Sequence, residues 1–152
     1  MKPAAWRSVG AHYPYTTTLT PRFADMDIVG HLNNIALAEC HEEARVRFLC
    51  HLMGEDFLFR ARPYRLLVAR ASYDYLSEAH YPQPLEMRVG VETIGKTSFQ
   101  LALASFQEGR CVGLATVTGV AVGPEGPLPL PQELQDAFAH YRLQHPEEED
   151  RR

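Results

Sequence analysis

Asp27 and the segment that follows it hold the residue types that could act on a carbonyl group. Positions 22 to 37 read Arg-Phe-Ala-Asp-Met-Asp-Ile-Val-Gly-His-Leu-Asn-Asn-Ile-Ala-Leu. A strand-like segment ends in two aspartates, a Gly-His turn follows, and a helical pattern then begins. The first N–H groups of a helix have no intrahelical acceptor and carry a partial positive charge. A carboxylate beside such donors could activate water or attack a carbonyl carbon while the donors stabilise the oxyanion.

A long helix must position these groups. Apolar residues recur at spacings of three and four from about position 33 to 53, which predicts a helix buried on most of its surface. One asparagine at its start, Asn33 or Asn34, suits the N-cap. Glu43 and Arg47 have the spacing of an ion pair on the polar side, and Gly54 is expected to end the helix.

The rest of the chain indicates an antiparallel sheet. Residues 13–24 have a β-rich composition, and strands are predicted over 66–76, 85–94, 98–107 and 110–122. Glu108-Gly109 predicts a hairpin turn. The last four strands are expected to form a meander, followed by a short helix over 131–141 with Pro131 in its first turn. The order predicts an α+β fold in one domain, 1–152, with an ordered core over 13–141 and a disordered tail over 146–152.

Composition excludes several functions. The chain has 152 residues and a net charge of −4, which gives nucleic-acid binding no electrostatic support. The nearest approach to a basic cluster, Arg60, Arg62, Arg65 and Arg70, could meet one phosphate-bearing ligand. No segment approaches the roughly 18 apolar residues of a membrane helix, and the N-terminus does not resemble a signal peptide. We therefore expect a cytoplasmic protein without a membrane partner.

Three cysteines raise the question of a metal. The pairs Cys40-His41 and Cys50-His51 are ten residues apart on the predicted helix, so they point to different faces and do not converge on one ion. We interpret them as small core cysteines beside surface histidines. No metal site and no cofactor are predicted.

Four sequence elements occur in an order that resembles the hot-dog fold thioesterases, in particular the 4-hydroxybenzoyl-CoA thioesterase-like and acyl-acyl-carrier-protein thioesterase-like groups. They are Asp25-x-Asp27-x-x-Gly30-His31-x-Asn33-Asn34, Glu42-Glu43-Ala44-Arg45, Gly95-Lys96-Thr97-Ser98-Phe99, and Pro129-Leu130-Pro131 before Glu133-Leu134. The resemblance implies a long central helix wrapped by a curved antiparallel sheet of five to six strands. It also implies a homo-oligomer, a dimer or a dimer of dimers, with active sites between subunits beside the helix N-terminus.

The resemblance assigns roles near the helix start. Asp27 matches the catalytic carboxylate, which acts as base or nucleophile, and the backbone N–H of Asn34 matches the donor that polarises the carbonyl. His31 could orient water or bond Asp27, or it could simply hold the turn. Gly30 gives the turn its conformational freedom, and Asn33 opens the helix.

Further residues are implied at the substrate site. Glu43 matches a helix acid that lines the site in some relatives, with a surface ion pair to Arg47 as the alternative. Lys96, Thr97 and Ser98 match residues near the pantetheine or nucleotide, and Lys96 could instead be an ordinary exposed lysine. The family often has an aromatic residue where this chain has Leu37.

Hydrolysis of an acyl-CoA or acyl-carrier-protein thioester is therefore the expected function. A non-catalytic acyl-CoA-binding protein is the first alternative, because a fold does not guarantee chemistry. A hot-dog enoyl-CoA hydratase or dehydratase is the second. The chain lacks the Gly-x-Ser-x-Gly motif of a serine hydrolase and any dinucleotide-binding fingerprint.

Overall fold

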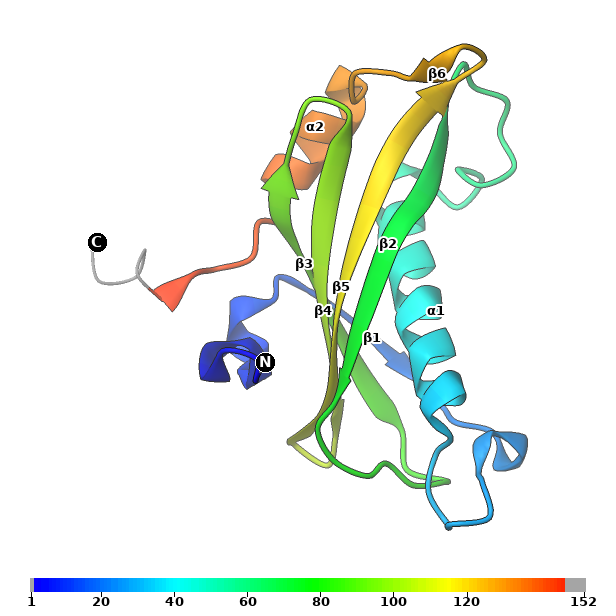
Figure 1. Cartoon of the computed structure of the whole chain (residues 1–152), viewed down its shortest axis with the longest axis vertical. Helices are drawn as coiled ribbons and strands as arrows, with labels where there is room; N and C mark the ends of the chain where they lie inside the picture. The colour runs from blue at the N-terminus through cyan, green and yellow to red at the C-terminus, as the bar shows by residue number, and fades with distance from the viewer. Residues whose placement is uncertain (1, 147–152) are drawn as a thin grey trace.

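The computed structural model describes residues 2–146 and has one long helix against one face of a twisted antiparallel sheet (Figure 1). In chain order the elements are the 3₁₀ turns η1 (Ala5–Ser8) and η2 (Gly10–His12), β1 (Tyr15–Leu19), η3 (Phe23–Asp25), α1 (Asn34–Met53), β2 (Arg65–Tyr75), β3 (Leu85–Ile94), β4 (Ser98–Gln107), β5 (Arg110–Gly123), β6 (Gly126–Pro127) and α2 (Gln132–Ala139). This is the predicted α+β class with the hot-dog arrangement. The predicted disordered tail falls largely on residues 147–152, which lie outside the described part.

The sheet order is β1-β3-β4-β5-β2, with β6 paired to β5. The predicted meander is right for β3, β4 and β5 but wrong for β2, which pairs with β5 instead of β3. The free edge of β3 is taken by β1, and the nine-residue connection from Leu76 to Pro84 carries the chain across the sheet. β2 consequently forms an outer edge of the sheet.

The helix α1 begins and ends where the sequence predicts. Asn33 is the N-cap and accepts a hydrogen bond from the Ile35 N–H, while Gly54 follows with a φ of 100°. Most residues of the helix are buried or partly buried, as predicted, and the exposed ones are Asn34, Ile35, Glu39, Glu43, Arg47 and His51. The fully buried residues are Ala36, Leu37, His41, Ala44, Phe48, Leu49 and Met53.

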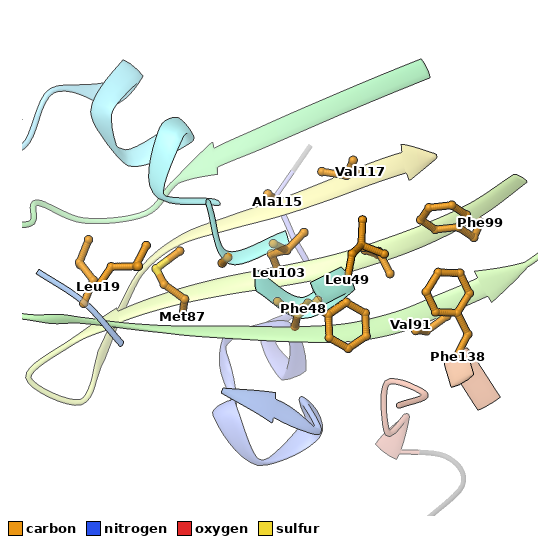
Figure 2. Packing of buried hydrophobic residues seen from close by; sticks show 14 of the residues in the cluster. Leu19, Phe48, Leu49, Met87, Val91, Phe99, Leu103, Ala115, Val117 and Phe138 are labelled. Carbon is orange, nitrogen blue, oxygen red and sulfur yellow. The ribbon is translucent and has the colours of Figure 1, made fainter. Parts of the chain in front are cut away.

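The core lies between this stripe and the concave face of the sheet. Figure 2 shows Phe48 and Leu49 of α1 among Met87 and Val91 of β3 and side chains of β4, β5 and α2. Phe138 of α2 stacks parallel to Phe48 and closes one end of the core. This packing fixes the position of α1, and therefore of its N-terminus, relative to the sheet.

The segment before α1 differs from its prediction. β1 ends at Leu19, and Phe23–Asp25 forms the turn η3 instead of continuing the strand to the two aspartates. Pro21 lies between the two elements and cannot donate to a strand ladder, which explains the early end. The predicted hairpin at Glu108-Gly109 is confirmed, with φ of 51° and 77°. Pro131 is the N-cap of α2 and not in its first turn.

Candidate active site at the start of the long helix

Asp27 lies in a compact loop that leads directly into α1. Its N–H donates to the carbonyl oxygen of His31 at 3.0 Å, and its own carbonyl oxygen accepts from the Gly30 N–H at 3.2 Å. Oδ1 of Asp27 accepts from the Val29 N–H at 2.9 Å, which forms an Asx turn. Gly30 has a φ of 93°, a conformation that a side chain would strain. The loop thus fixes the Asp27 backbone close to the helix start.

The two asparagines have different positions at the helix start. The Asn33 side chain accepts from the Ile35 N–H at 2.8 Å, and its N–H donates to the carbonyl oxygen of Asp25 at 2.8 Å. Asn34 is the first residue of α1 and is exposed. Its N–H lies in the first turn, where helix geometry offers no intrahelical acceptor.

Asp25 has a structural role in the turn η3. Its Oδ2 accepts from the Arg22 N–H at 2.7 Å, and its Oδ1 lies 2.8 Å from the Arg22 guanidinium. The hydrogen bond from the Arg22 side chain lowers the pKa of Asp25, because it stabilises the carboxylate. Both oxygens of the Asp25 carboxylate are therefore used to stabilise the turn.

The end of β2 holds the helix start, which the sequence did not predict. The Tyr75 hydroxyl donates to the carbonyl oxygen of Asn34 at 3.0 Å. The Leu32 N–H donates to the carbonyl oxygen of Ala79 at 2.7 Å. Forty or more positions separate these partners along the chain, so no local pattern could have paired them.

The connection between β2 and β3, from Leu76 to Pro84, contributes charged and titratable groups. His31 Nε2 lies 3.3 Å from Oε1 of Glu78, and the His80 ring meets the His31 ring edge-on. His80 Nδ1 is 3.3 Å from the carbonyl oxygen of Gly30. The His31 side chain thus faces Glu78, whereas its contact with Asp27 is made through main-chain atoms.

Gln107 anchors this connection to the sheet. Its side-chain amide is buried, accepts from the His80 N–H at 2.7 Å, and donates to the carbonyl oxygens of His80 and Gln83 at 2.8 and 2.9 Å. The sequence signal for this anchor was a glutamine at the end of an apolar strand, because a buried amide needs hydrogen-bond partners.

A pocket of about 370 Å³ lies between the helix start and the end of β2. It brings together the predicted residues His31 and Asn34 and adds Leu32, Leu37, Tyr75, Leu76, Ser77, Glu78 and Ala79. Asp27, Gly30 and Asn33 belong to the adjoining loop and are not among the lining residues. The pocket joins apolar walls to a few polar groups, a common composition for a ligand site.

Glu43 lies in a different place. Its Oε1 is 2.9 Å from Nε of Arg47, the ion pair predicted as the alternative role. With Asp25 and Cys40 it lines a separate pocket of about 320 Å³. Within one chain it does not join His31 and Asn34.

Lys96, Thr97 and Ser98 lie at the opposite end of the sheet. The carbonyl oxygens of Lys96 and Thr97 accept from the N–H groups of Leu130 and Ala121 at 2.8 and 2.9 Å. The Lys96 residue is exposed. One chain therefore does not bring these predicted substrate-binding residues to the Asp27 loop.

The position of His41 shows that the interpretation of the pair Cys40-His41 was wrong. His41 is 2% exposed, not a surface residue, and its Nε2 lies 3.2 Å from Oγ of Ser105. The cysteines Cys40 and Cys50 are only partly buried, because the helix turns His41 toward the sheet instead. Burial lowers the pKa of His41 to about 4. Within residues 2–146 no three His, Cys, Asp or Glu side chains gather as metal ligands, and no helix there is long and apolar enough to cross a membrane.

Comparison with known proteins gives a family and a fold. The sequence model of one protein family, the thioesterase-like superfamily, matches residues 21–138 of this chain. Similar solved structures include the PA5185 protein of Pseudomonas aeruginosa, with 30% identity, a TM-score of 0.79 and coverage of 88% of this chain and 95% of that one. A predicted thioesterase of Bacillus stearothermophilus has 26% identity, a TM-score of 0.78 and coverage of 86% and 98%. A 1,4-dihydroxy-2-naphthoyl-CoA thioesterase from Synechocystis has 20% identity, a TM-score of 0.73 and coverage of 82% and 95%. A comparison with the curated proteins finds no match.

Proposed function

Because the chain belongs to the thioesterase-like superfamily, we propose that it hydrolyses an acyl-CoA thioester with Asp27 as the catalytic carboxylate. One observation carries the assignment of the residue. The Asp27 backbone is hydrogen-bonded to the backbone of His31 and Gly30, in the loop that leads into α1. One short segment therefore holds a carboxylate and the N–H donors of a helix start. Attack on a thioester needs both groups.

The chemistry follows from these two groups. In one route the Asp27 carboxylate takes a proton from water, and the oxygen adds to the thioester carbon. In the other route the carboxylate adds directly and forms an anhydride, which water then hydrolyses. In both routes the carbonyl oxygen becomes negative and accepts a hydrogen bond from the Asn34 N–H, and collapse of the intermediate expels the thiolate.

The pocket beside the helix start supports an acyl-binding role. Its apolar residues Leu32, Leu37 and Leu76 could cover the acyl group, while Asn34 and His31 border the carbonyl. CoA is favoured over a carrier protein by the name of one structural neighbour, a CoA thioesterase.

The edge of the sheet supports a homodimer. β2 has 11 residues, every one of them exposed or partly exposed, and Leu67 and Val68 are 44% and 43% exposed. Ile28 and Ile35 near the helix start are 104% and 70% exposed. An unpaired strand and exposed apolar side chains are what a second copy would cover, with the two β2 strands antiparallel across a twofold axis.

Light scattering during gel filtration tests the assembly. We expect a dimer for the wild type and dissociation for Val68→Glu, because a buried charge would face the partner strand. Val9→Glu makes the same change at a position of similar exposure, 45%, away from β2, and should remain dimeric. A wild-type monomer at all concentrations would refute the dimer.

Release of free thiol from a panel of acyl-CoAs tests the reaction. Asp27→Asn keeps an oxygen that can accept from the Val29 N–H, so the loop should survive while kcat falls by about 100-fold or more. Equal rates for the two proteins would refute the role of Asp27. Saturable acyl-CoA binding without turnover across the whole panel would favour a non-catalytic binding protein. Turnover in heavy-oxygen water tests direct attack, because the label enters Asp27 only when water opens an anhydride at the Asp27 carboxyl carbon.

A further inference from the structure

A second pocket lies at the opposite end of the molecule from the Asp27 loop. Its lining comes from the connection between α1 and β2 and from the end of β5: Arg62, Pro63, Tyr64, Arg65, Val122, Gly123 and Pro124. Its volume is about 280 Å³. Figure 1 shows this connection at the top of the view, beside β6, whereas the loop before α1 lies at the bottom.

The Arg62 guanidinium is held in place by aromatic rings. Its carbon Cζ lies 3.9 Å from the centre of the Phe57 ring and 5.6 Å from the centre of the Tyr64 ring. Phe57 is 1% exposed, so the stacking surface belongs to the core. Nε and Nη1 are covered and make no hydrogen bond within residues 2–146. A stacked guanidinium keeps its charge, and Nη2 is the one guanidinium nitrogen of Arg62 that is not covered.

Both arginines of this pocket lack a carboxylate partner in the described part of the chain. The nearby Arg60 is paired with Asp56 at 3.6 Å, whereas neither Arg62 nor Arg65 has a carboxylate oxygen within 4.0 Å there. Burial, with a smaller contribution from Glu133, raises the pKa of Tyr64, so one carboxylate is nearby, but it forms no ion pair with either arginine. The pocket is therefore positively charged.

The turn that holds Lys96 and Thr97 lies against the same end of β5 as the pocket. Arg65 pairs with Val122 in the sheet, and the preceding residue of β5, Ala121, donates its N–H to the carbonyl oxygen of Thr97. Arg65, the end of β5 and the Lys96 turn thus lie side by side at one end of the sheet. Two nearby arginines, Arg62 and Arg65, and Lys96 from a separate turn border this end.

We propose that Arg62 and Arg65 bind a phosphate group of the nucleotide end of a CoA thioester, an inference that rests on the proposed function. The exposed Arg65 can offer paired N–H donors to a phosphate and Arg62 can offer Nη2, while Tyr64 and the flanking prolines offer apolar walls to the rest of the nucleotide. α1 alone is about 30 Å long, which exceeds the reach of the pantetheine arm to the Asp27 loop of the same chain. In an antiparallel β2 dimer, the pocket of one subunit lies toward the helix start of the other, so one substrate spans both subunits.

Calorimetric titration with CoA, dephospho-CoA, pantetheine and inorganic phosphate tests this site. We expect the double variant Arg62→Ala/Arg65→Ala to bind CoA at least about tenfold more weakly than the wild type and to bind pantetheine unchanged. Arg65→Ala alone should weaken CoA binding too, and it leaves the Arg62–Phe57 stack intact if the double variant fails to fold. Arg142→Ala, which removes an exposed arginine outside this pocket, should match the wild type.

Each contrary result overturns the site. CoA binding that is unchanged in Arg65→Ala and in the double variant removes the arginines from the ligand. Inorganic phosphate bound as tightly as CoA indicates a simple anion site without a nucleotide. Loss of pantetheine binding as well would indicate a structural role.

Kinetics separates this proposal from the hydrolase proposal. If both hold, the arginine variants raise KM for an acyl-CoA, leave kcat unchanged and leave KM for an acyl-pantetheine unchanged. Arginine-dependent CoA binding without any turnover supports the pocket and refutes the hydrolase. Turnover with unchanged KM in the arginine variants supports the hydrolase and refutes the pocket.

Discussion

The hydroxyl of Tyr75, the last residue of β2, donates to the carbonyl oxygen of Asn34, the first residue of α1, at 3.0 Å. This bond ties the edge strand to the helix turn that carries the proposed oxyanion donor. Because only well-placed donors stabilise a transition state, a small shift of the helix start should cost activity before it costs stability.

We therefore expect Tyr75→Phe to lower kcat by about three- to tenfold, since a lost hydrogen bond is worth about 1 kcal/mol. The melting temperature should change little, because Tyr75 is 45% exposed and stays outside the core. Tyr81→Phe removes the hydroxyl of another exposed tyrosine and serves as the matched control. An unchanged kcat in Tyr75→Phe would show that the helix start is positioned without this bond.

The two aspartates of the loop should separate stability from activity. Asp25→Asn weakens the pair with Arg22, so the free energy of unfolding at neutral pH should fall. Asp27→Asn should leave that free energy nearly unchanged and abolish most turnover. Urea denaturation and thiol release on both variants check the assignment. The opposite pattern would exchange the roles of the two residues.

Local patterns were enough to predict most of the secondary structure. Asn33, Gly54 and the Glu108-Gly109 turn each satisfy a backbone requirement within a few residues, and the structure confirms them. The pairing of β2 with β5 was not predicted, because it depends on which edge of β3 is already occupied.

The candidate site divides in the same way. Asp27, Gly30 and Asn34 could be proposed from the sequence because they lie within one short motif. Tyr75 and Glu78 could not, since their contacts with the loop are made across the fold. The buried position of His41 was also missed, because the helical pattern alone did not specify which face the sheet covers.

Gly119 should be the glycine most sensitive to an added methyl group. A Cβ atom there would lie 2.2 Å from Cζ of Phe99, whose ring packs 4.7 Å from that of Phe138 in the core. We expect Gly119→Ala to lower the free energy of unfolding by about 1–3 kcal/mol, measured by urea denaturation.

A double variant tests the cause of that loss. Phe99→Leu should remove the clash and make the combined loss smaller than the sum of the two single losses. Gly10→Ala is the control, because its Cβ would meet ordinary contacts at 3.6 Å. Additive losses in the double variant would mean that position 119 needs glycine because of its backbone conformation and not because of the Phe99 ring.

His41 should make the protein less stable in mild acid. Its pKa is about 4 in the folded protein, because burial disfavours the charged ring, against about 6.5 in the unfolded chain. Between these two values the unfolded chain binds more protons, so the free energy of unfolding falls as the pH falls from 6.5 to 4, by up to about 3 kcal/mol. His41→Leu removes the titrating ring and leaves Ser105 its bond to the carbonyl oxygen of Gly113 at 3.2 Å. Urea denaturation across this range should give a clearly steeper pH dependence for the wild type than for His41→Leu. Parallel curves would mean that His41 is already accessible to protons in the folded protein.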